Sequence, residues 1–554
     1  MTESADWRRQ VSPQEIERYR HLGWWRDRTF LDDFLDAVAR HPDKTAVVSY
    51  RHGMPGPTEF TFGELGRLVD RIAGGLIALG VQRGDVITLH LPNSWEFPAM
   101  AFGAMRAGAV PNPVPHIYRE RELAFTIRHS GAKVYVVDSE FRGFDYRGLG
   151  LRLKAAIPTL EHVVAIGGAP SDDVVDFAAH FVEPPRELDD QLAHELAERQ
   201  PGPDDPAFLM FTSGTTGQPK AAVHTHNTAW SAGRALPDAI GLTSDDVAFM
   251  ASTVGHLTGT LWGAYFPMAG GQKIVYQDVW NARQLLDIAD AEGITWTLSA
   301  TPFVNDLVLA QKDAPRPLSS FNTFVCGGAP IPPQTAVDAR EHLDMELLSL
   351  WGMTEIGICS IHNRGAALET LAASDGMPVG HMELRIVDED LMPVEDGMEG
   401  RLQARGPSII VGYRGQPELT REAQTDDGWF ETGDLGRRTS DGGIRLTGRS
   451  KDIIIRGGQN VPVVEIENCL LGHGMVREVA VVAYPDDRLG ERGCAVVVPE
   501  GATPTLDDLT RHLEAEGFAK QFWPERIEIV EALPRTPAGK VQKFVLRAQI
   551  ATSA

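Results

Sequence analysis

The sequence has few cysteines and no long apolar run. Its four cysteines, Cys326, Cys359, Cys469 and Cys494, form no CxxC pair, which argues against a disulfide framework or a zinc site and favours a reducing compartment. No stretch is long and apolar enough to cross a bilayer, and the first ten residues lack the apolar core of a signal peptide. We therefore expect a cytoplasmic protein without integral membrane association.

Positive charge is also scarce. Lys and Arg number 52 against 76 Asp and Glu, a formal net charge of −24, so nucleic acid is an unfavourable general partner. Small anions are not excluded, because salt screens charges beyond about 8 Å and a local basic cluster can dominate its own cleft. With 554 residues, 43% of them hydrophobic, the chain is long enough for more than one globular domain. The sequence leaves the oligomeric state open, a homodimer included.

Up to about residue 440, short β-branched runs alternate with helical patterns. TAVVSY (45–50), VITLHL (86–91) and KVYVVD (133–138) have the composition of strands. Between the first two, leucine, valine and isoleucine residues recur at helical spacing, and Thr61 and Glu64 precede them at capping-box spacing. This alternation predicts an α/β fold with layered, mostly parallel sheets.

The C-terminal remainder has a different order of elements. DIIIRG, EVAVVAYP, CAVVVP and RIEIVEALP have strand patterns, VEIENCLL and LDDLTRHLEAEG have helical patterns, and the chain ends in a basic tail. We therefore predict a large N-terminal α/β domain of layered, mostly parallel β-sheets with helices, and a small α+β C-terminal domain. The boundary is expected near Gly448, after a turn between strands at TSDGGIRL (439–446).

One short segment raises a question about chemistry. FTSGTTGQPK (211–220) follows the apolar run AFLM (207–210). A glycine-rich turn after a strand can direct backbone N–H groups at an anion, with three hydroxyl side chains and the Lys220 ammonium added; a flexible surface turn has the same composition. The segment is not a Walker loop, because Ala221 follows the lysine and Pro219 stands where the second glycine belongs.

Four further motifs follow in order along the chain. They are LWGMTE (350–355), TGD (432–434), GRSKD (448–452) and RTPAGK (535–540), and each alone is typical of an ordinary turn. Together with the glycine-rich loop they resemble the acyl-adenylate-forming superfamily, which includes acyl-CoA synthetases, aryl-acid adenylating enzymes, peptide-synthetase adenylation domains and beetle luciferases. The resemblance covers nearly the whole chain. It implies that a carboxylate attacks the α-phosphate of MgATP to give an acyl-adenylate and pyrophosphate, and that a thiol then displaces AMP.

The resemblance implies a role for each motif. The loop at 212–220 would cradle the β- and γ-phosphates, Thr354 would contact the α-phosphate, and Glu355 would ligate Mg²⁺. Asp434 would accept hydrogen bonds from the ribose hydroxyls, and Lys540 would be the catalytic cation between carboxylate and α-phosphate. The residues implied to be catalytic are Lys540, Thr354, Glu355 and His256. Those implied to bind ATP or CoA are Thr212, Ser213, Gly214, Thr215, Thr216, Gly217, Lys220, Gly327, Gly328, Ala329, Trp351, Asp434, Arg449, Gly457 and Gly458.

The domain boundary has a role of its own in this superfamily. The small domain swings between the half-reactions about a residue two positions after the conserved arginine, here Lys451 after Arg449. Residues 1–448 would then form the adenylating domain, with ATP and the acyl acid, 449–451 the hinge, and 452–554 the mobile domain with the catalytic lysine.

The swing would withdraw Lys540 and bring Gly457 and Gly458 to the site, where they let a pantetheine arm pass close to the backbone. The alternative is that RGG is an ordinary turn with no role in binding the pantetheine arm. Two features depart from the usual pattern. Trp351 stands where tyrosine is most common, which we expect to alter the acyl pocket or the ribose packing, and Pro462 falls one position earlier than expected.

Histidine occurs twice near these motifs. HTH (224–226) could suggest a metal pair, but no carboxylate or cysteine cluster accompanies it, so a packing or hydrogen-bonding role is favoured. His256, in GHLTG, falls in the region that borders the acyl carboxylate in the superfamily, and we expect it to act as a pocket gate; a purely structural role is the alternative.

The expected acid pocket is mostly apolar and contains no lysine or arginine. A neutral-bodied carboxylate, aromatic, alicyclic or medium-chain, fits it better than an amino acid, whose ammonium would need a buried carboxylate. The local sequence most resembles cyclohexanecarboxylate- and related carboxylate–CoA ligases, whereas YRHLGWW (19–25) resembles aryl-acid ligases that load carrier proteins. The pocket residues are His256, Leu257, Thr258, Gly259, Trp262, Val304, Cys326, Trp351, Gly352 and Met353.

We consider three functions for this chain. The first is an ATP-dependent carboxylate–CoA ligase with Mg²⁺, ATP and CoA, favoured over its rival because no carrier domain is fused to this sequence. The rival is a stand-alone enzyme that makes the same adenylate and passes it to a carrier-protein phosphopantetheine. The third, from another class, is a non-catalytic nucleotide-binding protein, which the joint presence of Glu355, Asp434, Arg449 and Lys540 disfavours.

Overall fold

The computed structural model describes residues 8–9, 11–212, 219–328, 331, 333–449, 454–456, 459–486, 489–518, 520–536 and 539–552. Its first elements match those expected from the sequence. β1 (Thr45–Tyr50), β3 (Val86–His90) and β5 (Val134–Asp138) are buried strands. Helix α3 (Phe62–Ala78) lies between the first two and begins with the predicted capping box of Thr61 and Glu64.

The largest sheet has a parallel centre with antiparallel edges. Along its order, β1, β13, β12, β14, β15 and β16 pair in parallel, while β2, β17 and β18 add antiparallel strands at the two edges. Parallel central strands confirm the predicted fold class. The strands not yet bounded are β2 (Thr58–Thr61), β12 (Val247–Met250), β13 (Lys273–Gln277), β14 (Trp296–Ser299), β15 (Thr323–Gly327), β16 (Glu346–Met353), β17 (Gly357–Ile361) and β18 (Met377–Pro378).

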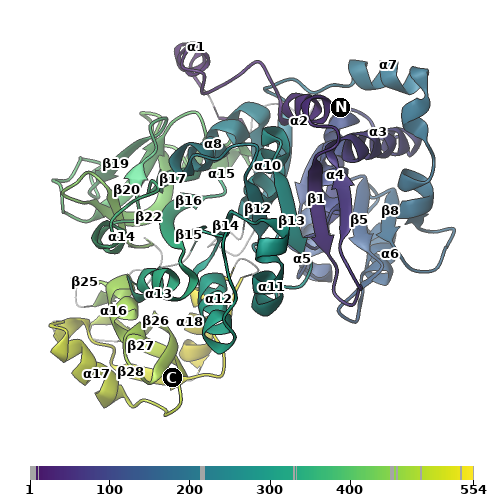
Figure 1. Ribbon diagram of the computed structural model, residues 1–554. Helices are drawn as coiled ribbons and strands as arrows, with labels where there is room; N and C mark the ends of the chain where they lie inside the picture. Colours follow the sequence, from purple (N-terminus) through teal and green to yellow (C-terminus); the bar gives the residue numbers. More distant parts are fainter. Residues whose placement is uncertain are drawn as a thin grey trace.

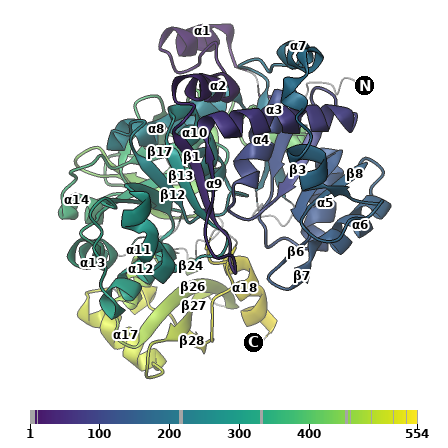
Figure 2. The ribbon, with the colours of Figure 1, turned by 45° about the vertical axis from the view of Figure 1, so that its right-hand side comes forward.

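A second sheet is parallel throughout its described strands, in the order β4-β3-β5-β8-β9. Figures 1 and 2 show it beside the largest sheet, with α3 and α4 close to both. Ligands of such sheets bind at the carboxyl ends of the strands, and the segments that follow β3, β12 and β15 all carry residues discussed below. The added strands are β4 (Val110–Pro113), β8 (His162–Ile166) and β9 (Val175–Asp176).

Two antiparallel sheets complete the N-terminal part. One has the order β10-β11-β21 and the other β19-β20-β22-β23. Of the turn predicted at 439–446, residues 439–443 join the last two strands and 444–446 belong to β23. Their bounds are β10 (Pro206–Thr212), β11 (Lys220–Thr225), β21 (Gly412–Tyr413), β19 (Glu383–Val387), β20 (Gly400–Arg405), β22 (Phe430–Arg438) and β23 (Ile444–Arg449), and a small hairpin adds β6 (Glu140–Phe141) and β7 (Phe144–Asp145).

The C-terminal part has its own sheet and apolar clusters. In Figures 1 and 2 it lies below α12. The basic tail expected at the end of the chain includes a helix, α18, over residues 543–552, with Leu546 and Ile550 buried four positions apart. The elements are β24 (Ile454–Arg456), β25 (Gln459–Val461), β26 (Val476–Asp486), β27 (Gly490–Pro499), β28 (Arg526–Ile529), α16 (Val463–Leu471), α17 (Leu506–Ala515), α18 (Lys543–Thr552) and a 3₁₀ turn η5 (Lys520–Phe522).

The remaining helices cover the sheets. They are α1 (Pro13–His21), α2 (Phe30–Arg40), α4 (Glu96–Arg106), α5 (Glu120–Ser130), α6 (Tyr146–Ala156), α7 (Asp190–Glu198), α8 (His226–Ile240), α9 (Leu257–Thr260), α10 (Phe266–Gly270), α11 (Ala282–Glu292), α12 (Thr301–Asp313), α13 (Pro333–Leu343), α14 (Leu368–Ala373) and α15 (Pro417–Glu422), with π-helical turns η2 (Ala178–Val182) and η4 (Leu261–Tyr265) and a 3₁₀ turn η3 (Arg186–Leu188).

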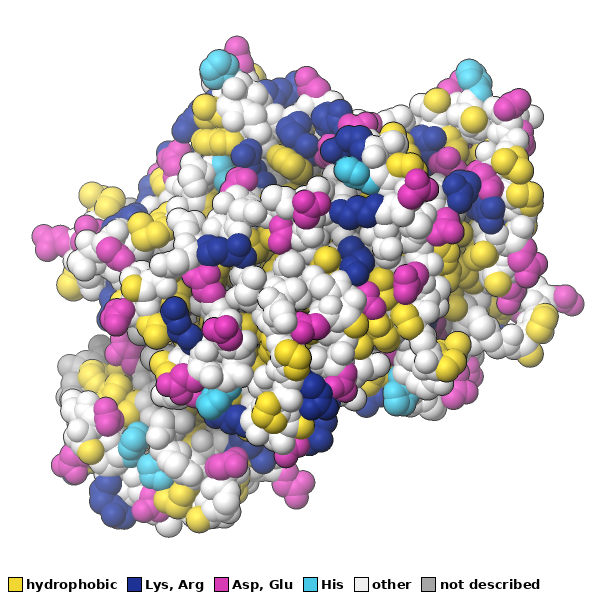
Figure 3. All heavy atoms as spheres, in the orientation of Figure 1, with side chains coloured by type: hydrophobic (Ala, Val, Ile, Leu, Met, Phe, Trp, Pro, Cys, Tyr) yellow, Lys and Arg dark blue, Asp and Glu magenta, His cyan; other side chains and the backbone are white. Residues whose placement is uncertain are grey.

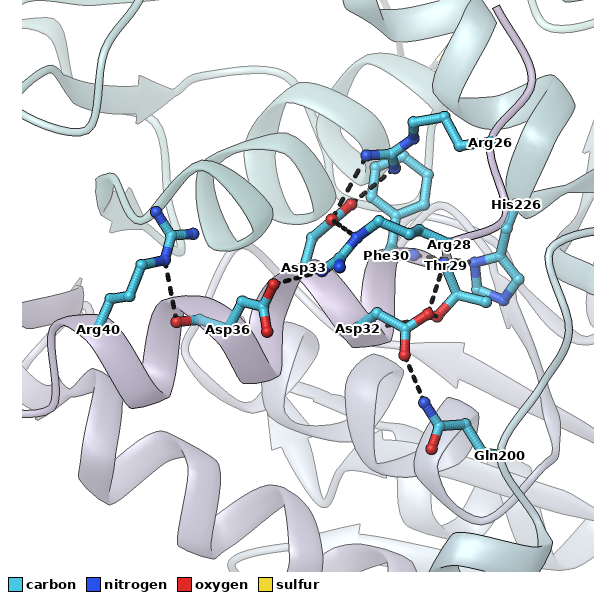
Figure 4. A network of polar contacts seen from close by, with 10 residues as sticks. All are labelled: Arg26, Arg28, Thr29, Phe30, Asp32, Asp33, Asp36, Arg40, Gln200 and His226. Atoms are coloured by element: carbon cyan, nitrogen blue, oxygen red, sulfur yellow. Dashed lines mark hydrogen bonds and ion pairs between the residues drawn. The ribbon is translucent and has the colours of Figure 1, made fainter. Parts of the chain in front are cut away.

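The start of α2 shows how the N-terminal segment is fastened to the body (Figure 4). Thr29 and Asp32 form a capping box, and Asp33 accepts hydrogen bonds from Arg26 at 2.7 Å and Arg28 at 3.0 Å. The backbone N–H of Phe30 donates to Nδ1 of His226 at 3.3 Å. These contacts satisfy the first backbone donors of α2 and tie the helix to α8.

The surface carries both signs of charge. Figure 3 shows Lys and Arg side chains interspersed with Asp and Glu over one face. No helix among the described residues is long and apolar enough to span a bilayer. All four cysteines are free thiols, three of them buried.

Candidate active site

The predicted phosphate loop is the connection of a β-hairpin. Strands β10 and β11 are antiparallel, and Thr212 and Lys220 are the last paired residues at the base of the loop. Residues 213–218 lie outside the described part of the chain. The Lys220 ammonium lies 4.9 Å from the centre of the Tyr413 ring, which places a cation at the mouth of the hairpin over an aromatic face.

Glu355 lies in the tight turn between β16 and β17, beside that hairpin. It is buried, with 6% of its surface exposed, and its Oε1 accepts hydrogen bonds from the Tyr413 hydroxyl at 3.0 Å and the Thr212 hydroxyl at 3.4 Å. Burial, followed by the charge of Glu355, raises the pKa of Tyr413 well above its usual range, so the phenol remains a hydrogen-bond donor. The carboxylate is therefore held in one orientation by two neighbouring hydroxyls.

The backbone of Thr354 is held by a hydrogen bond with His224. The Nε2 of His224 hydrogen-bonds the Thr354 carbonyl at 2.8 Å, and its Nδ1 lies 3.1 Å from the hydroxyl of Thr228. Burial lowers the pKa of His224 to about 4, so the ring is neutral near pH 7. With His226 bonded to the start of α2, each histidine of HTH has a hydrogen-bonding role.

Asp434 is paired across two strands and to an indole. Asp434 on β22 and Arg449 on β23 are directly opposite each other, with a distance of 3.0 Å between Oδ1 and the arginine Nε. The other oxygen, Oδ2, accepts a hydrogen bond of 2.8 Å from the Trp351 indole N–H. Since cross-strand neighbours are held by the sheet itself, the backbone positions this carboxylate and the tryptophan sets its rotation.

Lys540 lies against the same group of residues, although it belongs to the C-terminal part. A Cβ placed on Gly328, just after β15, would be 3.4 Å from Cε of Lys540, so the lysine side chain lies in van der Waals reach of this glycine. Burial and the neighbouring Arg449 charge lower the pKa of Lys540 to about 8, against the opposing effect of Asp434 and Glu355. The Thr536 backbone N–H donates to the Lys540 carbonyl at 2.7 Å, and the Lys540 backbone N–H donates to the Thr536 hydroxyl at 3.1 Å. An ammonium is thus presented beside two carboxylates and an arginine.

His256 lies at the start of α9, in the segment after β12. Burial, followed by the charge of Lys540, lowers its pKa to about 4. Its Nε2 is buried and has no hydrogen-bond partner, a state that costs free energy unless another group occupies the space. The ring therefore presents an unused nitrogen in the neighbourhood of Lys540.

Two family models match the chain. One is the AMP-binding enzyme model, over residues 34–414, and the other is the AMP-binding enzyme C-terminal domain, over residues 465–540. The chain belongs to the AMP-binding enzyme family. Its two matched segments correspond to the large N-terminal part and the small C-terminal part of the fold.

Relatives of this AMP-binding enzyme resemble it over nearly their whole length. The medium-chain fatty-acid–CoA ligase of Escherichia coli is 34% identical over 539 residues, 97% of this chain and 93% of that one. The salicyl-AMP ligase / salicyl-S-ArCP synthetase of Mycobacterium tuberculosis is 32% identical over 538 residues, 96% and 92% of the two chains. The ATP-bound structure of MatB from Rhodopseudomonas palustris superposes with a TM-score of 0.80 at 26% identity, covering 94% and 98%. The protein is an adenylate-forming acid ligase that uses ATP and a carboxylic acid.

The structure brings together most of the expected site residues that it describes. Thr212 bonds Glu355, which follows Thr354 in the chain, and both Trp351 and Arg449 contact Asp434. Lys540 lies beside Gly328, which follows Gly327, and Lys220 pairs with Thr212 across the hairpin. Of the expected residues, Ser213, Gly214, Thr215, Thr216, Gly217, Ala329, Lys451, Gly457 and Gly458 lie outside the described residues.

Some expected pocket residues lie deeper in the fold. Val304 and Cys326 belong to a buried apolar cluster. The indole N–H of Trp262 donates to the Gly233 carbonyl at 2.9 Å, and the ring lines a cavity of about 250 Å³ that Trp230 and Trp296 also line. Trp262 therefore contributes to the packing of η4 on α8.

Sequence reasoning missed Tyr413, which bonds Glu355 and faces Lys220. Its signal was weak, a lone aromatic residue within VGYRG. Among the described residues, the group whose ligand atoms could together hold a cation is Asp338, Glu341 and His342 on α13. It does not include Glu355.

Proposed function

We propose that this AMP-binding enzyme is an ATP-dependent carboxylate–CoA ligase that acts through an acyl-AMP. The observation that carries the adenylation step is the position of Lys540 beside Gly328, within the electrostatic reach of Glu355, Asp434 and Arg449. An ammonium from the C-terminal part meets, at the end of a parallel sheet, the residues that the superfamily uses for a nucleotide.

In the first half-reaction, a carboxylate oxygen of the acid forms a bond to the α-phosphorus of ATP, and the bond to pyrophosphate breaks. Both reactants are anions, so positioned cations lower the barrier. Lys540 would bridge the acid carboxylate and the α-phosphate, Thr354 would donate to the α-phosphate, and the loop at 212–220 would hold the departing phosphates.

The nucleoside would be held by the residues around Asp434. Its carboxylate would accept the ribose hydroxyls, because two oxygens provide more acceptor positions than Trp351 and Arg449 occupy. Gly327, Gly328 and Ala329 would flank the adenine, where the absence of side chains lets a flat base approach the backbone.

Magnesium would be held by Glu355. Its buried carboxylate with the Thr212 hydroxyl nearby offers oxygen ligands of the kind Mg²⁺ prefers, and the phosphates supply the others. When bound, the ion supplies positive charge to the phosphates. The Tyr413 and Thr212 hydroxyls orient the carboxylate for it.

In the second half-reaction, the sulfur of the thiol forms a bond to the acyl carbon and the bond to AMP breaks. We propose CoA as the acceptor, with residues 449–451 as hinge and Gly457 and Gly458 beside the pantetheine arm. The medium-chain fatty-acid–CoA ligase relative supports this acceptor. The mostly apolar residues expected around the acid support an aromatic, alicyclic or medium-chain substrate.

The alternative is transfer of the acyl group to a carrier-protein phosphopantetheine. The salicyl-S-ArCP synthetase relative, at similar identity and coverage, supports it. Both proposals share the acyl-adenylate and differ only in the thiol that removes it.

Pyrophosphate release across a panel of aromatic, alicyclic and medium-chain acids tests the proposal. Each acid is assayed alone, with CoA, and with a phosphopantetheinylated carrier protein. Release that depends on the acid and is accelerated by CoA, with acyl-CoA as product, is the expected result. Acceleration only by the carrier protein would favour the alternative, and release that no acid stimulates would contradict both.

A further inference from the structure

Asn93 is a buried polar residue at a junction between the two parallel sheets. It follows the end of β3, in LPNS, and exposes only 6% of its surface. Its Nδ2 donates hydrogen bonds of 2.9 Å to the carbonyls of Met250 and Ser252, and its Oδ1 accepts one of 2.9 Å from the Val254 N–H. One side-chain amide thus bonds the backbone of every second residue from the end of β12 onward: Met250, Ser252 and Val254.

These bonds connect separate sheets. β3 belongs to the sheet β4-β3-β5-β8-β9, and β12 belongs to the largest sheet. Asn93 therefore ties segment 250–254, at the end of β12, to the neighbouring sheet. An amide has two N–H donors and one carbonyl acceptor, and here all are used. Neither Asp, which lacks the donors, nor Leu, which lacks every polar group, could make the same set.

The next residue of the segment is pressed against the same sheet. A Cβ on Gly255 would overlap the backbone of Val114 and Pro115, just beyond β4. The Pro115 carbonyl is in turn bonded to Nε2 of the buried His90, at 3.1 Å. Glycine is required here by the close approach of two backbones, and the approach leaves the segment little freedom to shift.

The held segment leads directly into His256. The His256 backbone N–H donates to the Thr253 carbonyl at 3.1 Å. The Thr260 hydroxyl, on α9, donates to the Val254 carbonyl at 2.8 Å. The position of the His256 ring is therefore determined by a turn whose two anchors are Asn93 and the backbone beyond β4.

We propose that Asn93 is a positioning residue for the acid pocket: from the neighbouring sheet, it fixes the turn that carries His256 and so sets where the acid carboxylate can bind. This inference rests on the proposed function, which places the acid beside His256. The hydrogen bonds of the Asn93 amide all go to the backbone of residues 250–254, so its proposed role is to hold this segment. Its loss should therefore weaken use of the acid and leave use of ATP close to normal.

The test compares Asn93→Ala with Asn112→Ala. Asn112 is also buried, lies on the adjacent strand β4, and donates to the Thr88 hydroxyl at 3.1 Å, within its own sheet. For Asn93→Ala we expect the KM for the acid to rise about tenfold or more, because small misplacements near reacting groups have effects of that size, with the KM for ATP within about twofold. For Asn112→Ala both constants should stay near those of the wild type. Equal increases in both KM values, or the same effect from both variants, would overturn the proposal.

Hydrogen exchange of residues 250–260 gives a readout that does not depend on activity. In Asn93→Ala, amides of this segment, that of Val254 first, should exchange faster than in the wild type and in Asn112→Ala. Unchanged exchange there would refute the positioning role, whether or not the enzyme uses the tested acids. If exchange rises but no acid supports pyrophosphate release in the wild type, the proposed function fails and the anchoring by Asn93 stands.

Gly255→Ala provides a second route if Asn93→Ala does not fold. It should displace the same turn from the other side and raise the KM for the acid, whereas Gly56→Ala, where a Cβ meets no atom within 4 Å, should not. An unaltered KM for the acid in Gly255→Ala would contradict the proposal.

Discussion

Lys540 shows how a single residue acquires its chemistry from its surroundings. Burial and the Arg449 charge lower the pKa of Lys540 to about 8. The protonated form is the one that can stabilise the anions, so kcat/KM for ATP should be level below pH 8 and fall as the pH rises through about 8, since this parameter reports the free enzyme.

Replacement of Lys540 tests that assignment. Lys540→Ala should slow adenylation by about a thousandfold or more while ATP still binds, because the charge acts mostly in the transition state. In Lys540→Arg, which stays charged at high pH, the alkaline fall should move upward. Pyrophosphate exchange measures the rate and titration calorimetry the ATP affinity. The same alkaline limb in Lys540→Arg would assign it to another group.

The Trp351 indole N–H accounts for one partner of Asp434. Trp351→Phe removes a hydrogen bond to a charged oxygen, worth about 1.5–3 kcal/mol, while Arg449 remains. We expect the KM for ATP to rise about tenfold, measured at saturating acid. Trp296→Phe is the control, because the buried Trp296 indole N–H has no partner and its removal should leave that KM unchanged.

The charged residues that the structure brings together stand in recognisable sequence motifs, whereas the residues that hold them in place do not. Asp434, Arg449 and Glu355 are found together because their motifs are short and their chemistry is specific. Tyr413 and Asn93 carry no such signal. Tyr413 bonds Glu355 and faces Lys220, and Asn93 bonds residues 250–254, all of them far from it along the chain. Only the paired strands and sheets bring those segments together.

At the scale of elements, α3 illustrates a helix whose start is specified locally. The Thr61 hydroxyl accepts the Glu64 N–H and the Glu64 carboxylate accepts the Thr61 N–H. Thr61→Ala should destabilise the N-terminal part by about 1 kcal/mol, and Thr61→Ser should not. The midpoint of denaturant unfolding and the exchange of the first amides of α3 measure this. Equal midpoints for the wild type and Thr61→Ala would show that packing alone fixes the helix start.

The same locality decided which elements could be predicted. β1, β3 and β5 were expected from β-branched runs, and α3 from its periodicity and cap, because these signals lie within the element. No helix was expected over α18, because Lys540, Lys543 and Arg547 mark the segment as a basic tail; Leu546 and Ile550, four positions apart and buried, were the signal for a helix.

At the scale of the whole molecule, the contacts between the C-terminal part and the N-terminal part include two that involve charged side chains. Lys540 lies beside Gly328, and Arg437 on β22 pairs with Glu465 on α16 at 3.2 Å. The ion pair is about 40% exposed on both sides, so it contributes less than about 1 kcal/mol. This ion pair would therefore oppose the proposed swing only weakly, and the swing is what would bring Gly457 and Gly458 to the site for thioester formation.

Lys451 is the residue about which that departure would turn, by its spacing from Arg449. Lys451→Pro fixes one backbone dihedral and removes an N–H, so the swing should be hindered while the adenylation arrangement persists. We expect acyl-AMP formation within a fewfold of the wild type and thioester formation at least about tenfold slower. Single-turnover assays separate the two steps, and Lys451→Ala, which keeps the backbone free, is the control. Equal loss of both steps in Lys451→Pro would place the hinge elsewhere, because a swing about residue 451 affects only the step that follows it.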